Sequence, residues 1–387
     1  MTTTVAHRVA GSLDTLIHDG LRALDITATE RERVVSRYTQ LGEALDEHWI
    51  ATRGDNSISP QGSFALGTVV RNVHRSDDID IDCVALKDVA KASVGQAELK
   101  ADVGIAARKY ARSACSGGPE LSQCSRCWTL SWPGMHLDIL PAIPNDDAGG
   151  SNIWITDREV SRWLPSNPGG YADWFRGRMH AQLLHERAVE AKRLEVEDVP
   201  EWQVRTVLQR VVQALKRHRD IYFSDRLDER PSSIVITTLA AHAYTGSGDL
   251  YEVLRNLPAE MARHLTRVQG RWTLPNPVQD GENFTDSWAS EPERAEYFFE
   301  WVEEAERTFR SFGMSKGLER TLPLLESAFG SRFATAASAS LGQSLFGARQ
   351  RGQLYVGNRG TLSAATGGVA AGSYSVKGHR FGGGPTR

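Results

Sequence analysis

The chain has 387 residues, of which 40% are hydrophobic and 24% are charged, and its formal net charge is -3. This length is enough for a substantial buried core in two lobes or domains. No run of eighteen apolar residues occurs and the first ten residues lack an apolar segment, so we expect neither a membrane span nor a signal peptide. These features predict a cytoplasmic protein that does not associate with membranes.

Charge is distributed unevenly along the chain. Residues 328–387 contain seven basic residues and no acidic residue, whereas residues 1–327 carry 38 Lys and Arg against 48 Asp and Glu. Binding of duplex nucleic acid requires clustered Lys and Arg that neutralise phosphates. We therefore expect no nucleic-acid activator for a protein whose main body is acidic.

The first strong helical pattern begins at Thr27. Thr27 and Glu30 form a capping-box pattern, and apolar residues then recur at three- and four-residue spacing as far as Trp49. Turn-forming residues at 53–60 are expected to end this helix. The pattern predicts a long helix that packs one face against the core.

The pair Gly62-Ser63 follows this loop, at the expected start of a short helix. Glycine lets the backbone approach a ligand closely, and the N-H groups of a helix N-terminus favour an anion. The serine hydroxyl adds a further donor. We therefore predict that Gly62 and Ser63 bind the phosphates of a nucleotide.

An alternating pattern at 78–86 predicts the first strong strand. Asp80 and Asp82 would lie on one face, since side chains two residues apart on a strand point the same way. Two adjacent carboxylates repel each other unless a cation lies between them, and Mg²⁺ prefers such hard oxygen ligands. The strand therefore predicts a Mg²⁺ site, in which Mn²⁺ can substitute, with Asp78 at its rim.

A hairpin is predicted after a helix at 93–114. Its strands are residues 127–132 and 135–140, Pro133-Gly134 forms the turn, and Pro141 is expected to end the second strand. Asp138 is the one acid on an otherwise apolar strand. We predict that Asp138 joins Asp80 and Asp82 as a third catalytic and metal-binding carboxylate, as two-metal phosphoryl transfer requires.

Four cysteines are too few for a disulfide scaffold in a chain of this length. Cys115, Cys124 and Cys127, with His136, have a spacing that would also suit a zinc site. Cys127, however, falls at the start of a predicted strand, where a small apolar residue is expected. Reduced thiols are the preferred interpretation, and zinc is not expected.

The segment from residue 165 to 329 is predominantly helical in pattern. Helices are predicted at 170–190, 201–222, 291–312 and 317–329, around a buried apolar element at 233–244. The stretch 330–387 contains thirteen glycines and favours a flexible basic tail. The predicted domains are therefore 1–165, with N-terminal helices and a catalytic core, 166–329, a helical lobe, and 330–387, the tail.

The combined motifs resemble the bacterial CD-NTases, which are relatives of cyclic GMP-AMP synthase and oligoadenylate synthase. The core motifs are Gly62-Ser63-Phe-Ala-Leu-Gly67-Thr68, Asp80-Ile-Asp82 and His136-Leu-Asp138-Ile-Leu-Pro141. The helical-lobe motifs lie at 166–175, 215–220, 233–241 and 282–284. Together they cover roughly residues 30 to 330, which makes the resemblance far more specific than any single motif.

This resemblance implies an α+β fold, with a polymerase-β-like nucleotidyltransferase core, built on a mixed sheet with helices, and an all-helical C-terminal lobe. It implies NTP substrates, ATP or GTP among them, which are condensed into a cyclic di- or trinucleotide second messenger. In the family's CBASS anti-phage systems, this messenger activates a separate effector protein. By position, Asp80, Asp82 and Asp138 match the family's metal-binding acids, and Gly62 and Ser63 match its phosphate-gripping pair.

Two helical-lobe residues match positions that contact the donor triphosphate. Lys216 lies at the end of an amphipathic helix, where its ammonium can reach a phosphate. The alternative is a solvated lysine within the basic run 216–219. Ser233 is the matching serine, and its neighbour Ser232 is an alternative.

Two rival functions remain open at the sequence level. A nucleotidyltransferase with the same active site could modify a protein or RNA acceptor, and an inert cleft would make the protein a nucleotide-binding scaffold. Accessory proteins of the same operon are possible partners, because some family members are conjugated through their C-termini. The Gly-Gly run near Arg387 suits such conjugation, although a plain disordered tail is preferred.

Overall fold

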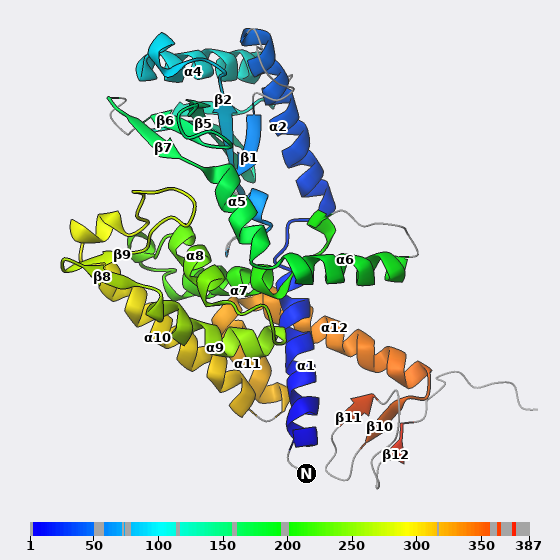
Figure 1. The fold of residues 1–387 in the computed structure, drawn as a ribbon. Coiled ribbons are helices and arrows are strands. Elements are labelled where there is room, and N and C mark those ends of the chain that lie inside the picture. The colour runs from blue at the N-terminus through cyan, green and yellow to red at the C-terminus, as the bar shows by residue number, and fades with distance from the viewer. Residues whose placement is uncertain are drawn as a thin grey trace, which may run out of the picture.

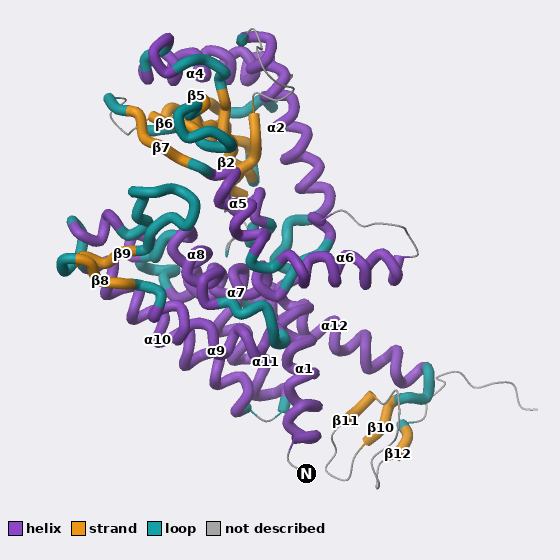
Figure 2. The backbone as a smooth tube through the Cα atoms, viewed as in Figure 1, coloured by secondary structure: helices purple, strands orange, loops and turns teal. Residues whose placement is uncertain are grey.

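The computed structural model describes residues 3–49, 58–71, 73, 79–113, 117–156, 161–194, 201–315, 317–356, 362–364 and 374–376. Figure 1 shows a lobe that contains the main sheet above a lobe made of helices. The strands of the main sheet gather in the first lobe, as the colouring by secondary structure makes plain (Figure 2). None of the helices within these described ranges has the length and apolar character needed to cross a membrane. The predicted combination of an α+β core and a helical lobe is confirmed.

The sheet of the first lobe is mixed and has seven strands among the described residues. Its main path has the order β1-β2-β5-β4-β3, while β6 pairs with β5 and β7 pairs with β6. Only the central pair β2 and β5 is parallel. The strands are β1 (Ile58–Gln61), β2 (Ile79–Leu86), β3 (Glu120–Gln123), β4 (Trp128–Trp132), β5 (Met135–Pro144), β6 (Ile153–Thr156) and β7 (Trp163–Ser166).

Two helices share the core of this lobe with the sheet, α2 (Ala28–His48) and α4 (Gln96–Ser113). The predicted capping box is present, because the Glu30 N-H donates to Thr27 Oγ1 at 3.2 Å and the Thr27 N-H donates to Glu30 Oε2 at 2.7 Å. This reciprocal pair satisfies two otherwise unpaired donors at the helix start. It fixes the point at which α2 begins.

Pro141 does not end its strand, contrary to the sequence-based expectation, since β5 continues to Pro144. The pairing of β5 explains this difference. On one side β4 pairs with β5 only as far as Ile139, and β6 takes over at Ala142. Pro141 falls in the gap between these two partners, where the sheet needs no N-H donor from it.

The second lobe has one continuous hydrophobic core, whose largest fully buried side chains include Trp301 and several phenylalanines. The buried element predicted at 233–244 is the helix α8, which lies inside this core. The other helices of the lobe are α5 (Pro168–Gly177), α6 (His180–Leu194), α7 (Val207–Tyr222), α9 (Leu250–Arg263), α10 (Glu293–Met314) and α11 (Leu318–Phe329), and α8 spans Ser233–Ala243.

Two predicted helices of this lobe have different bounds in the structure. The segment 170–190 is divided between α5 and α6, and Arg178 at the break donates to the carbonyls of Ala241 and Tyr244, both at 2.9 Å. The helix predicted from 201 instead begins at Val207, because Thr206 caps it together with Gln209. The short hairpin of β8 (Thr266–Val268) and β9 (Arg271–Thr273), and the helix α9, were not predicted.

The N-terminal helix α1 (Thr3–Arg22) belongs to the helical lobe, which corrects its assignment to a domain at 1–165. Its apolar residues Leu16, Ile17 and Leu21 are buried in the core of that lobe. A helix at the very start of the chain thus packs on elements that follow it by more than two hundred residues (Figure 1).

The stretch after residue 330 is not a flexible tail throughout, contrary to the prediction. Residues 331–350 form the helix α12 (Ser331–Gln350), which packs along α1. A Cβ on Gly20 would lie 2.5 Å from the ring of Phe333, so the close approach of the two helices depends on that glycine. Short strands β10 (Leu354–Val356), β11 (Leu362–Ala364) and β12 (Tyr374–Ser375) follow, and residues 377–387 lie outside the described part of the chain.

Candidate active site

The three predicted acids lie on the two central strands of the sheet. Asp82 is directly opposite Asp138 in the parallel register of β2 and β5, and Asp80 is opposite His136. Along each strand the residues between these positions are buried, as Ile81 and Leu137 illustrate, whereas the acids are exposed or half-buried. The expected shared face of Asp80 and Asp82 is therefore confirmed, and Asp138 lies beside it.

Gly62 lies against the carboxylate of Asp82. Gln61 pairs with Asp82 between β1 and β2, and Gly62 then begins the short helix α3 (Gly62–Leu66) with a φ of 60°. A Cβ at this position would overlap Asp82 Oδ2 and lie 3.1 Å from Asp82 Cγ. Only glycine allows both this left-handed backbone and this approach. The structure thus joins the Gly-Ser element directly to the acids.

Burial and charge together perturb Asp82. Its pKa is raised to about 6, first by desolvation and then by the charges of Asp138 and Asp80, while the charge of Lys216 acts in the opposite direction. A carboxyl group in this setting is stabilised by a cation, because a cation offsets both the burial and the repulsion. The electrostatic environment of Asp82 is therefore that expected beside a bound cation or a substrate-borne positive charge.

The donor set of this face consists of carboxylate oxygens, the ligand type that Mg²⁺ prefers. Within the described ranges, no three His, Cys, Asp or Glu side chains converge closely enough to hold a metal by themselves. Mg²⁺ commonly retains water and is completed by substrate phosphates, so a site with few protein ligands suits it. Asp78, expected at the rim, lies outside the described residues.

Thr129 is a site residue that the sequence analysis missed. It is the register partner of Asp138 on β4, and its hydroxyl donates to Asp138 Oδ1 at 2.6 Å. This bond fixes the orientation of one carboxylate oxygen. The signal was present in the sequence, because a two-residue turn at Pro133-Gly134 places Thr129 opposite Asp138.

Lys216 is buried, with only 6% of its surface exposed, which overturns the alternative of a solvated lysine. Its Nζ donates to Thr68 Oγ1 at 3.2 Å and to the Thr68 carbonyl at 3.4 Å. Desolvation and the nearby charge of Arg219 lower the pKa of Lys216 to about 7, although Asp220 and Asp82 oppose this shift. The charge of Asp82 therefore acts on the Lys216 amine, and a pKa of about 7 leaves this amine only partly protonated at neutral pH.

One face of α7 holds the loop that follows the Gly-Ser helix. Gln209 Nε2 donates to the Leu66 carbonyl at 2.9 Å, and Gln213 Nε2 donates to the Val69 carbonyl at 2.8 Å. Lys216 continues this series one turn further along the helix, as side chains at spacings of three and four share a helix face. The helical lobe thus fixes the position of the loop at 66–69.

Ser233 is exposed at the first position of α8, and its neighbour Ser232 is the N-cap residue. The hydroxyl of Ser233 accepts a bond of 2.9 Å from Arg219 Nη1, and Arg219 is itself paired with Asp220. Ser233 is therefore linked through Arg219 to the C-terminal half of α7, which also carries Lys216. Of the two candidates, Ser233 is the one with this connection.

The motif at 166–175 has a structural explanation. Asn167 caps α5 by accepting a bond from the Gly170 N-H at 2.8 Å, and a side chain on Gly170 would collide with that cap. The hydroxyl of Tyr171 contacts Thr238 Oγ1 at 2.7 Å inside the lobe core. These residues orient α5 between the sheet and α8.

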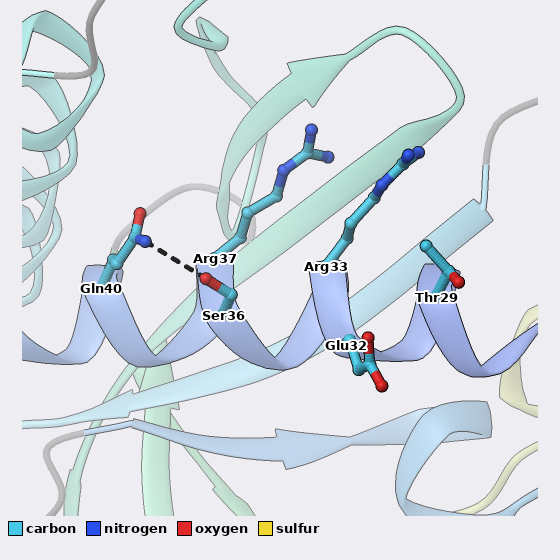
Figure 3. A pocket seen from close by; sticks show the side chains of 6 residues that line it. All are labelled: Thr29, Glu32, Arg33, Ser36, Arg37 and Gln40. Atoms are coloured by element: carbon cyan, nitrogen blue, oxygen red, sulfur yellow. Dashed lines mark hydrogen bonds between the residues drawn. The ribbon is translucent and has the colours of Figure 1, made fainter.

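A recess of about 420 Å³ lies on the exposed face of α2. Figure 3 shows the side chains of Arg33 and Arg37 extending from the helix next to each other, with Gln40 bonded to Ser36. Thr29 and Glu32 complete its lining. None of these residues belongs to the predicted catalytic or nucleotide-binding set, so the recess is separate from the candidate active site.

The four residues whose spacing would suit zinc, a metal that was not expected here, cannot all be placed, since Cys115 lies outside the described residues. Cys124 and Cys127 close the turn between β3 and β4, where the Cys124 N-H donates to the Cys127 carbonyl at 3.0 Å. His136 is engaged through Nδ1 with Ser131 Oγ at 2.8 Å.

Comparison with known proteins identifies relatives of this architecture. Residues 12–178 match the family model described as the Second Messenger Oligonucleotide or Dinucleotide Synthetase domain. A c-di-GMP synthase of Roseivirga ehrenbergii is 30% identical over 317 residues, which cover 80% of this chain and 81% of that protein. The cyclic dinucleotide synthase CdnG of Bradyrhizobium diazoefficiens is 27% identical over 68% of this chain and 66% of its own length.

Solved structures share the fold. The structure of Bradyrhizobium diazoefficiens CdnG in complex with GTP superposes with a TM-score of 0.65 at 22% identity, over 86% of this chain and 98% of that chain. The structure of Escherichia coli MS115-1 CdnC with ATP gives a TM-score of 0.59 at 16% identity, over 82% and 98% of the two chains.

Proposed function

The chain belongs to the bacterial CD-NTase family, and from that premise we propose that it condenses NTPs into a cyclic di- or trinucleotide at the acids of β2 and β5. The observation that carries the proposal is the register of Asp82 against Asp138, with Gly62 packed against Asp82. In this arrangement a nucleotide held by the Gly-Ser backbone would present its phosphates to the carboxylate face. The named relatives are cyclic dinucleotide synthases, and the solved structures include complexes with GTP and ATP.

Asp80, Asp82 and Asp138 are the residues that would hold Mg²⁺, or Mn²⁺ in its place. Bound there, the metal would acidify the attacking hydroxyl and neutralise charge on the triphosphate. The protein's own contribution is orientation: Thr129 fixes an oxygen of Asp138, and Gly62 admits the phosphates next to Asp82. Lys216, in the C-terminal half of α7, and Ser233, the first residue of α8, are the proposed contacts to the donor triphosphate.

We extend the proposal to the biological setting that the family suggests. The product would act as a cytoplasmic second messenger in anti-phage defence and would activate a separate effector protein. Accessory proteins of the same operon would be further partners, and one solved relative, CdnC of Escherichia coli MS115-1, is recorded in complex with a HORMA protein. The acidic main body supports activity without duplex DNA or RNA.

The test is synthesis by the purified protein. With all four NTPs and Mg²⁺ or Mn²⁺, it should yield a phosphatase-resistant nucleotide product, and the double variant Asp80→Asn with Asp82→Asn should yield none. Asp173→Asn is the matched control, because the Asp173 side chain is 78% exposed on α5 and lies outside the proposed site. Omitting each NTP in turn then identifies the bases of the product.

Three results would contradict the proposal. Product formation by the double variant would show that Asp80 and Asp82 are not required for catalysis. Radiolabel from an NTP on a protein or RNA would show a different acceptor. Tight metal-dependent NTP binding without any turnover would show an inert nucleotide-binding protein.

A further inference from the structure

Two cysteines face each other beside the active-site strands. Cys124 and Cys127 occupy the positions that close the β3-β4 hairpin, because the pair Gln123 and Trp128 precedes them in the register. The Cys124 N-H donates to the Cys127 carbonyl at 3.0 Å. Cα atoms of residues hydrogen-bonded across an antiparallel hairpin lie about 5.5 Å apart, which is within the range that a disulfide spans.

The turn that carries these thiols is held in place by Lys100 of α4. Lys100, only 4% exposed, donates to the carbonyls of Cys124 and Ser125, and the latter bond is 2.8 Å long. The Trp128 indole N-H in turn donates to the Lys100 carbonyl at 2.7 Å. These contacts hold the backbone of the turn at Cys124 and Ser125.

A chain of hydrogen bonds connects this turn to a catalytic acid. Cys124 Sγ lies 3.3 Å from Thr129 Oγ1, and the Thr129 hydroxyl donates to Asp138 Oδ1 at 2.6 Å. A hydroxyl has one proton, so while Thr129 donates to Asp138 it must accept from the Cys124 thiol. Loss of that thiol proton therefore changes the surroundings of the group that orients Asp138.

We propose that Cys124 and Cys127 form a reversible redox site, whose oxidation to a disulfide weakens metal binding and synthesis at Asp138 through Thr129. The inference rests on the proposed function for its effect on synthesis. Cys124 is exposed and meets the oxidant, whereas Cys127 is half-buried behind it. Cys83, whose thiol donates to the Asp138 carbonyl at 3.3 Å, is fully buried and takes no part.

The oxidant is a hydroperoxide. Its terminal oxygen adds to Cys124 Sγ as the O-O bond breaks, which gives a sulfenic acid and releases an alcohol or water. Cys127 Sγ then bonds to Cys124 Sγ, the S-O bond breaks, and the hydroxide leaves as water with the Cys127 proton. Cellular thiols would reduce the disulfide again, so it would form only under oxidising conditions and would not be a structural disulfide.

The disulfide can be detected without any assay of activity. Trypsin cleaves after Arg126, between the two cysteines, so oxidised protein should give two peptides that separate only on reduction. Cys115 lies on the same tryptic peptide as Cys124, and the experiment therefore uses the background Cys115→Ser. Hydrogen peroxide should join these peptides in that background and fail to do so when Cys127→Ser is added.

The coupling to Asp138 is tested by Mn²⁺ titration and by the initial rate of synthesis. Oxidation should weaken Mn²⁺ binding and slow synthesis about three- to tenfold, the effect of losing one neutral hydrogen bond, and dithiothreitol should restore both. Cys124→Ser, which keeps a hydroxyl donor for Thr129 and removes the oxidisable thiol, should be unaffected by peroxide in both measurements. Absence of the linked peptides, or a disulfide that leaves Mn²⁺ affinity unchanged, would overturn the inference. A reduced protein that makes no product would instead contradict the proposed function. The linked peptides and the Mn²⁺ affinity would still test the redox site in that case.

Discussion

Gly62 and Asp82 are in such close contact that no side chain fits between them. Gly62 is in the left-handed region at φ 60°, and a Cβ there would overlap the Asp82 carboxylate. The contact brings a backbone suited to phosphate next to a carboxylate suited to metal. The two functions that the sequence suggested separately thus meet at one point.

Gly62→Ala should therefore displace the Asp82 carboxylate and abolish most synthesis. Gly134→Ala is the matched control, since Gly134 has a φ of 83° but nothing within 4 Å of its would-be Cβ. Both variants should lose about 1 kcal/mol from backbone strain, measured by denaturant unfolding. Only Gly62→Ala should also lose synthetic activity, whereas Gly134→Ala should retain it. Equal activity in the two variants would show that the contact is irrelevant to catalysis.

Asp82 should destabilise the metal-free protein at neutral pH. Its folded pKa of about 6 exceeds the unfolded value of 3.8, so the stability that it contributes is complete below pH 3.8 and is lost as pH rises through 6. In EDTA at pH 7.5, Asp82→Asn should therefore raise the free energy of unfolding by roughly 2 to 3 kcal/mol, and the gain should vanish near pH 4.

Thermal unfolding between pH 4 and 7.5 measures this difference, with the exposed Asp173→Asn as the control. Added Mg²⁺ should stabilise the wild type and have much less effect on Asp82→Asn. A gain that does not depend on pH would contradict the electrostatic origin.

The sequence predicted the local geometry of the candidate site more completely than it predicted the extent of the lobes that carry it. Strand alternation suffices to place Asp80 and Asp82 on one face, and the turn at Pro133-Gly134 sets the hairpin that holds Asp138. These are local rules. The alternation and the turn were confirmed because each depends on residues within a few positions of the chain, whereas the pairing of Asp82 with Asp138 joins two strands that are distant in the sequence.

The misses came from contacts between distant segments. The packing of Phe333 on Gly20 makes α12 a helix of the folded lobe, although glycine content favoured a flexible tail. The contact of Lys216 with Thr68, which precedes it by 148 positions, was likewise not predicted. A single sequence contains no signal for such pairs, because they depend on tertiary packing and not on local pattern.

Lys216 should take up a proton when a nucleotide binds. Its pKa of about 7 leaves it mostly neutral at pH 8, and adjacent phosphates would raise that pKa because they favour the charged form. Calorimetry with a non-hydrolysable NTP analogue, in buffers of different ionisation enthalpy at pH 8, should report an uptake approaching one proton. NTP affinity should accordingly fall as pH rises above about 7.

Lys216→Met should abolish this uptake and weaken analogue binding, whereas Lys109→Met should leave both unchanged, because Lys109 is an exposed residue on α4. Wild-type binding without proton uptake at pH 8 would mean that Lys216 does not meet the phosphates.

Gln213 should connect the stability of the helical lobe to nucleotide affinity. Its side-chain amide donates to the Val69 carbonyl and to Asp25 Oδ1, at 2.8 and 2.9 Å, and its oxygen accepts from Arg210 at 2.9 Å. Gln213→Leu leaves these partners unsatisfied and should cost about 1 to 3 kcal/mol of stability. Because the loop at 66–69 is then less firmly held, the KM for NTP should rise more than kcat falls.

Gln182→Leu separates this positioning effect from a general loss of stability. Gln182 accepts hydrogen bonds from the Val207 N-H and the Tyr244 hydroxyl in the same lobe, without touching the loop. We expect a comparable loss in the free energy of unfolding for Gln182→Leu, with an unchanged KM. Denaturant unfolding and steady-state kinetics of both variants distinguish the two roles of α7. A KM that rises only in Gln213→Leu would show that α7 positions the nucleotide-binding loop. A KM that rises equally in both variants would show that α7 supports the fold alone.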